Sequence, residues 1–127
     1  MGKLYFGQSL DVIKRIIISG FKPGEILRDN LIEAMIDARN SVGLNRRFRP
    51  AVLVLEAPTN PKLLVQIESQ IIVQKSFSPI SLEILLVKID FRAPHLARVA
   101  KSVSPLTMLD LPPYSKKPFN KKLGTRI

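Results

Sequence analysis

The spacing of apolar residues along this chain changes once, near residue 51. Before that point, Leu27, Leu31 and Ala38 belong to an apolar series that recurs every three or four residues, as on one face of a helix. After it, short apolar runs stand between turn-forming segments, as strands do. We therefore predict an α+β fold, in which two N-terminal helices pack on a mainly antiparallel β-sheet that begins at residue 51.

The first helix is predicted from Ser9 to Gly20. A serine can cap free N–H groups, Asp11 places an acid in the first turn, and glycine is typical of a helix end. The apolar residues spaced for one helical face are Leu10, Val12, Ile13, Ile16 and Ile17. Consecutive β-branched residues lower helix propensity, so a strand through residues 16–18 is the alternative.

The second helix is predicted from about Pro23 to Val42, with Gly43 as its stop. Turned away from its apolar stripe are four acids at successive steps of four residues: Glu25, Asp29, Glu33 and Asp37. Like charges at this spacing cost about 0.2–0.5 kcal/mol per pair in an isolated helix. This acidic stripe is either a solvated helix face or a docking surface for a basic segment of a protein partner.

A basic connector, "LNRRFRP", follows the second helix. Arginines beside an aromatic residue can hold a nucleic-acid backbone and stack a base. The candidate nucleic-acid-binding residues are Arg46, Arg47, Phe48 and Arg49. In the alternative interpretation, the phenylalanine packs in the core and the arginines stay in water.

Three later segments predict two further parts of the sheet and a short helix. In "KLLVQIESQIIVQ" the residues expected on one buried face are Val65, Ile67, Ile71 and Val73. The segment "SLEILLVKIDF" is apolar on both faces, so its strand is either central in a layered sheet or covered by another chain. A short helix is expected in "RAPHLARVAKSV", with Leu96, Val99 and Val103 on its apolar side.

The end of the chain is the basic pole of the protein. Residues 92–127 hold eight Lys and Arg against one acid, which is +7 of the chain's net charge of +10. We assign residues 1–104 to one α+β domain and residues 105–127 to an extended C-terminal arm, because prolines prevent a regular element there. Apolar residues among the charges indicate an arm that lies along a surface, with disorder as the alternative. The arm residues predicted to bind a partner are Tyr114, Lys116, Lys117, Phe119, Lys121, Lys122 and Arg126.

Catalytic and cofactor signatures are absent from the sequence. Without cysteine there is no disulfide, thiolate nucleophile or cysteine metal site. The single histidine, His95, is expected to be structural or exposed because its surroundings are basic and apolar. There is no glycine-rich phosphate loop and no nucleophile elbow. We therefore expect no enzyme, no cofactor and no bound metal.

No segment predicts a membrane anchor or an export signal. The longest apolar runs, Val52–Leu55 and Ile84–Val87, are far shorter than the roughly 18–20 residues that a transmembrane helix needs. The first residues lack the long apolar stretch of a signal peptide. We expect synthesis inside the cell, followed by incorporation into a virion if the protein is a virion component, and no membrane partner. A peripheral membrane role through the basic C-terminal segment is a weaker alternative.

Two functions agree with these features. The first is a structural subunit of a large oligomeric assembly, such as a virion or a phage tail, whose copies are held together by the arm and the sheet surface. The alternative is a basic RNA-binding component of a ribonucleoprotein such as a ribosome, since a basic pole attracts any polyanion. We favour the first because of the strand with two apolar faces, the arm and the acidic stripe. Its partners are protein subunits, whereas the alternative requires nucleic acid.

Overall fold

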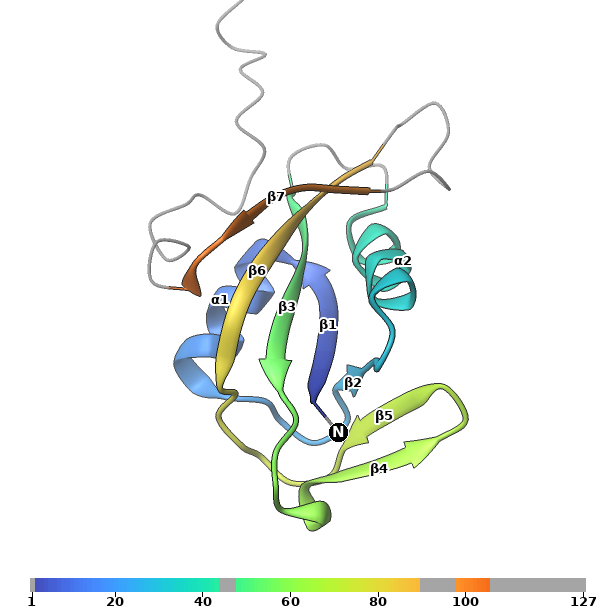
Figure 1. The fold of residues 1–127 in the computed structure, drawn as a ribbon, viewed down its shortest axis with the longest axis vertical. Coiled ribbons are helices and arrows are strands. Elements are labelled where there is room, and N and C mark those ends of the chain that lie inside the picture. The colour runs from blue at the N-terminus through green and yellow to red at the C-terminus, as the bar shows by residue number, and fades with distance from the viewer. Residues whose placement is uncertain (1, 44–47, 90–97, 106–127) are drawn as a thin grey trace, which may run out of the picture.

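The computed structural model describes residues 2–43, 48–89 and 98–105 (Figure 1). In chain order its elements, including the short 3₁₀ helix η1, are β1 (Lys3–Ser9), α1 (Leu10–Ser19), β2 (Ile26–Leu27), α2 (Leu31–Val42), β3 (Pro50–Glu56), η1 (Pro61–Leu63), β4 (Leu64–Ile67), β5 (Gln70–Val73), β6 (Ser81–Lys88) and β7 (Arg98–Val103). The strands form two antiparallel sheets, a larger one in the order β1-β3-β6-β7 and a smaller one in the order β2-β5-β4. The predicted α+β class with two helices and antiparallel sheets is confirmed.

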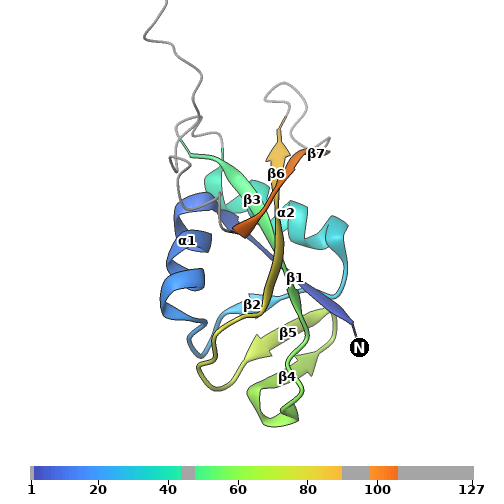
Figure 2. The same cartoon turned by 60° about the vertical axis from the view of Figure 1, so that its left-hand side comes forward.

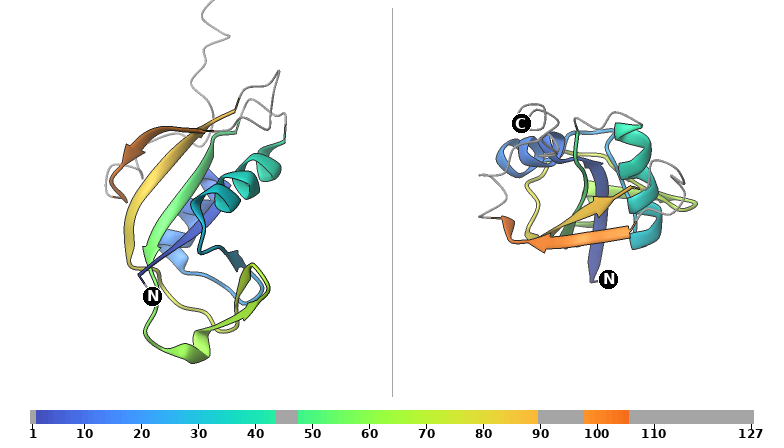
Figure 3. Two further views of the ribbon diagram at one scale, coloured as in Figure 1. Left: turned by 45° about the vertical axis from the view of Figure 1, so that its right-hand side comes forward. Right: turned by 90° about the horizontal axis from the view of Figure 1, so that it is seen from above.

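The two helices cover opposite faces of the larger sheet (Figures 2 and 3). Strand β3 explains this arrangement, because successive side chains of a strand point to its two faces in turn. Ala51, Leu53 and Leu55 belong to the core beneath α1, whereas Val52 and Val54 belong to the core beneath α2. The smaller sheet extends the core on the α1 side.

Strand β6 also carries an apolar residue on each face, as its sequence predicts. Ile84 and Leu86 lie in the core beneath α1, and Leu85 and Val87 lie in the core beneath α2. The strand sits between β3 and β7. Of the two predicted arrangements, the structure therefore has the central strand of a layered sheet, and its apolar faces are covered without another chain.

Helix α1 has the predicted limits. The hydroxyl of Ser9 donates to the Asp11 carboxylate at 2.5 Å and makes no cap hydrogen bond. At the other end, Gly20 takes a φ of 87°, which favours glycine, and its N–H donates to the Ile16 carbonyl at 2.7 Å. The alternative of a strand through residues 16–18 is wrong, because Ile13 and Ile16 bury one helical face against the sheet.

Strand β1 was not predicted, and it pairs with β3 along its whole length. Gly7 lies on this strand where α2 crosses it. A Cβ atom at this position would collide with the Ala34 carbonyl group and stand 2.9 Å from the backbone nitrogen of Ala38. The close approach of helix and strand therefore requires glycine.

The second helix is shorter than predicted. Its end at Gly43 is confirmed, but it begins at Leu31 and not near Pro23. The side chain of Asn30 caps the helix by accepting a hydrogen bond from the N–H of Glu33 at 3.1 Å. The preceding segment forms a turn and strand β2, which pairs with β5. Pairing with the smaller sheet thus replaces the first predicted turns of the helix.

The hairpin of β4 and β5 turns at residues 68–69, where one continuous alternation was predicted. Ile67 pairs with Gln70, and Gln66 pairs with Ile71. Paired residues share a face, so Ile71 lies on the face opposite to Ile67. The prediction placed on one face Val65, Ile67, Ile71 and Val73. This prediction is wrong because the chain reverses at the two-residue turn. Val65 and Ile67 lie on one face of the hairpin, and Ile71 and Val73 lie on the other.

Strand β7 stands where a short helix was predicted. It pairs with β6, so the helix prediction is wrong for residues 98–103. The rest of that prediction, residues 92–97, lies outside the described residues. Pairing with β6 gives backbone groups of both strands hydrogen-bond partners, and this outweighs the local helical spacing of Val99 and Val103.

Candidate functional site

The four acids predicted as one helical stripe lie on different elements. Glu33 and Asp37 are on α2, Asp29 is exposed in the bend before the helix, and Glu25 precedes β2. The stripe prediction is wrong because the helix begins only at Leu31. A partner could not meet these four carboxylates along one helix face.

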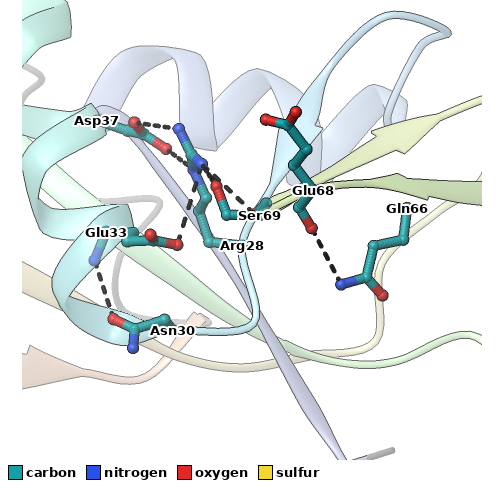
Figure 4. A network of polar contacts seen from close by, with 7 residues as sticks. All are labelled: Arg28, Asn30, Glu33, Asp37, Gln66, Glu68 and Ser69. Atoms are coloured by element: carbon teal, nitrogen blue, oxygen red, sulfur yellow. Dashed lines mark hydrogen bonds and ion pairs between the residues drawn. The ribbon is translucent and has the colours of Figure 1, made fainter.

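Arg28 binds the two acids that remain on α2 (Figure 4). Its Nε donates to Asp37 Oδ2 at 2.7 Å and its Nη2 to Asp37 Oδ1 at 3.1 Å, while Glu33 Oε1 lies 4.0 Å from Nη1. Nη1 also donates to the Ser69 hydroxyl at 3.2 Å. The hydrogen bond to Asp37 raises the pKa of Arg28, against the lowering effect of burial. The cluster joins α2, the segment after β2 and the hairpin turn, so these carboxylates already have a partner within the chain.

The basic connector is described only at its end. Arg46 and Arg47 lie outside the described residues. Phe48 packs against the core beneath α2, as the alternative interpretation has it. Arg49 is partly buried, and its carbonyl accepts from the N–H of Leu10 at 2.8 Å. Burial lowers the pKa of its guanidinium, and no acid of the described residues lies within ion-pair distance of it.

Strand β7 is the open edge of the larger sheet (Figure 3). Its residues 98–102 are exposed, and no strand of the described part of the chain pairs with its outer side. The Ser102 hydroxyl donates to Glu83 Oε1 at 2.6 Å, which fixes one side chain of β7 to β6. An edge strand of this kind offers unpaired backbone groups to another strand.

Three cations of β6 and β7 lie on one face, and the sequence prediction did not group them. Lys88 pairs with Arg98, and Lys101 pairs with Leu86, which belongs to the core beneath α1. Leu86 and Lys88 are alternate residues of β6 and share a face, and paired residues share it too. Arg98 and Lys101 are three residues apart on β7, but the register shift between Leu86 and Val87 brings both to this face, so the three cations lie on the α1 side. We call Lys88, Arg98 and Lys101 the basic ribbon. The basic segment 92–127 of the sequence contains Arg98 and Lys101 but not Lys88, and the predicted helix hid the face that the three cations share.

The predicted partner-binding residues of the arm all lie outside the described residues: Tyr114, Lys116, Lys117, Phe119, Lys121, Lys122 and Arg126. The same is true of His95. Their roles stay predictions. What the structure adds is the place where the arm begins, because β7 ends at Val103, just before it.

In the residues that the structure describes, no group of three or more His, Cys, Asp or Glu side chains could hold a metal ion. None of the described helices is both long and apolar enough to cross a membrane. Comparison with family models, with curated proteins and with solved structures found no match to this chain. A function is therefore best inferred from the surfaces that the fold leaves open.

Proposed function

We propose that this protein is a non-enzymatic structural subunit of a larger assembly, such as a virion or a phage tail. The observation that carries the proposal is the open outer edge of β7. Soluble proteins usually shorten, cover or charge such an edge, because it can pair with another chain. Here a six-residue strand ends the described part of the sheet. It carries Arg98 and Lys101 and an irregular register at Ala100, but residues 98–102 are exposed and Val99 and Ala100 between the two cations are apolar.

Two earlier supports for this function are weaker in the light of the fold. The apolar faces of β6 are buried by α1 and α2 and need no second chain. The acids Glu33 and Asp37 are engaged by Arg28, so a contact between the arm and an acidic helix is no longer the best model. The proposal now rests on the sheet edge and on the arm that follows it.

The partner that we propose for this edge is β7 of a second copy. In a fully overlapped antiparallel pair, Arg98 would stand opposite Val103, Val99 opposite Ser102 and Ala100 opposite Lys101. No cation would then face a cation directly, so the pairing avoids the repulsion that like charges cause. Such a contact is the same on both copies and closes as a dimer, which leaves the arm to link dimers into a larger object.

The test is light scattering during size-exclusion chromatography of the nuclease-treated chain across a salt series. We expect Val99→Lys to reduce the oligomer to a smaller species, because lysine on an edge strand opposes pairing. Ile18→Lys is the matched control, since Ile18 is exposed on α1 and gains the same charge. Removal of residues 112–127 should leave a folded dimer that no longer assembles further. A monomeric full-length chain at every salt concentration would refute the proposal.

A second candidate is nucleic-acid binding, and Arg49 is the observation that favours it. A partly buried guanidinium without an acidic partner among the described residues is a suitable contact for phosphate. The packing of Phe48 against the core leaves less support for base stacking by that residue. The candidate is therefore a ribonucleoprotein component that contacts the backbone. If it is correct, Arg49→Gln lowers the affinity for RNA and flattens its dependence on salt.

A further inference from the structure

Lys88 and Arg98 face each other directly across β6 and β7. Both side chains are exposed, and no acid of the described residues lies within ion-pair distance of either. Like charges in such a position destabilise a strand pair. The acid that these two strands do carry, Glu83, is on the other face, where it binds Ser102. Within the described residues the fold therefore leaves this pair of cations without a neutralising acid, and Lys101 lies on the same face.

We propose that the basic ribbon, Lys88, Arg98 and Lys101, binds the phosphate backbone of a nucleic acid. The inference does not depend on assembly through β7, and it adds a second site to the nucleic-acid candidate. An anion between the two strands converts their mutual repulsion into attraction to a shared ligand. Release of the ligand's counterions then contributes to the affinity.

The spacing of the ribbon suits a chain of phosphates. Lys101 stands opposite Leu86 and Arg98 opposite Lys88, so the two positions lie two residues apart along β6. That distance is about 6.8 Å in an antiparallel strand. The rise is about 3.4 Å per nucleotide along one strand of B-DNA, and each phosphate is also displaced sideways around the helix, so neighbouring phosphates are separated by more than the rise alone. The cations can therefore contact successive parts of one backbone.

The position of the ribbon in the fold also favours a nucleic acid. The end of β6 and the start of β7 stand at the end of the molecule away from the smaller sheet (Figure 1). Lys88, Arg98 and Lys101 are all exposed there, so a phosphate backbone can reach them without insertion of the strands into a groove. Binding to a membrane surface would need apolar side chains next to the cations, but Val99 lies on the opposite face, with Val87.

The experiment compares two triple variants of the full chain with equal loss of charge. One carries Lys88→Gln, Arg98→Gln and Lys101→Gln. The control carries Lys3→Gln, Lys62→Gln and Lys75→Gln, all exposed and on other elements. Binding is measured by fluorescence anisotropy with labelled single-stranded and duplex RNA and DNA across a salt series. We expect the ribbon variant to lose about 2–3 units of slope of log affinity against log salt, since each phosphate contact contributes about 0.7–0.9. The control should keep the wild-type slope.

Equal losses in both triple variants would overturn the proposal, because net charge alone would then explain binding. So would tighter binding to phosphatidylserine vesicles or to polyglutamate than to every nucleic acid. The affinities for RNA and for DNA show which of the two backbones the ribbon prefers.

A second measurement on the wild-type chain does not depend on how the variants fold. An oligonucleotide should protect Lys88 and Lys101 from an amine-reactive reagent, while Lys3 and Lys75 stay reactive. Uniform protection of all four lysines, or no protection of any, would contradict a site on the ribbon.

Discussion

The larger sheet ends in two different ways. On the outer side of β1, the N–H and the carbonyl of Tyr5 each bond to the backbone of Arg28 at 2.8 Å, and α2 packs across the strand. On the outer side of β7, no described residue provides a backbone partner, and most of the strand is exposed. The N-terminal edge is thus closed within the fold, whereas the C-terminal edge is left unpaired by residues 2–43, 48–89 and 98–105.

The largest effect should come from breaking the closed edge at Gly7. In Gly7→Ala the new Cβ meets backbone atoms of α2, which cannot rotate away as a side chain could. We expect the free energy of unfolding to fall by about 3 kcal/mol or more, at the upper end of overpacking effects. Chemical denaturation measures this, with Gly2→Ala as the control, because a Cβ at Gly2 meets nothing within 4 Å. Equal stability of both variants would show that helix and strand do not approach so closely.

A smaller effect should follow from loosening the same edge at Arg28. In Arg28→Met the two hydrogen bonds to Asp37 are lost and its carboxylate is left without this partner. We expect the free energy of unfolding to fall by about 1–2 kcal/mol. The effect is smaller than for a fully buried ion pair, because both side chains are partly exposed to water.

A double-mutant cycle with Asp37→Asn isolates the pair. The control is Arg15→Ala on the exposed side of α1, which should change stability by less than about 0.5 kcal/mol. Additive effects of the Arg28 and Asp37 substitutions would mean that the ion pair does not hold this edge.

The smallest change in the free energy of unfolding is expected at the open edge, and there the substitution should stabilise the protein. Lys88→Gln removes one of two cations that face each other, so the free energy of unfolding should rise by about 0.2–0.5 kcal/mol. The gain should shrink as salt screens the charges. Lys75→Gln, an exposed lysine outside the strands, is the control. A decrease in stability for Lys88→Gln would mean that the ribbon is not under repulsion.

The sequence correctly predicts those elements whose ends or faces are determined by residues close together in the chain. Gly20 and Gly43 end the two helices as predicted. The two apolar faces of β6 indicated either a central strand or one covered by another chain, and the structure has the first. Strand β1 was missed because its partner, β3, is far along the chain. The predicted start of α2 was wrong because β2 is a strand only through its pairing with β5. The residue pattern of the segment itself carries no sign of that distant partner.

The candidate sites, too, were predicted only as well as the elements that carry them. The acidic stripe was inferred from a spacing that is meaningful only if the helix starts at Pro23, so an error in one boundary removed it. The basic ribbon could not be found in advance, because Lys88 and Arg98 meet only through the β6–β7 register. Charge composition located the basic third of the chain but not the face on which its cations lie.

The pairing of β1 with β3 has a consequence for how the chain acquires its fold during synthesis. Ser9 pairs with Pro50 and Lys3 with Glu56, so the first strand cannot pair with the third until the ribosome has released residue 56. The helices have 10 and 12 residues, and isolated helices of this length are marginally stable in water, so they gain most of their stability when the sheet closes between them. We therefore expect the encounter of distant strands to be the slow step of folding. A chain stalled before residue 56 would then expose β1 without its complete partner strand.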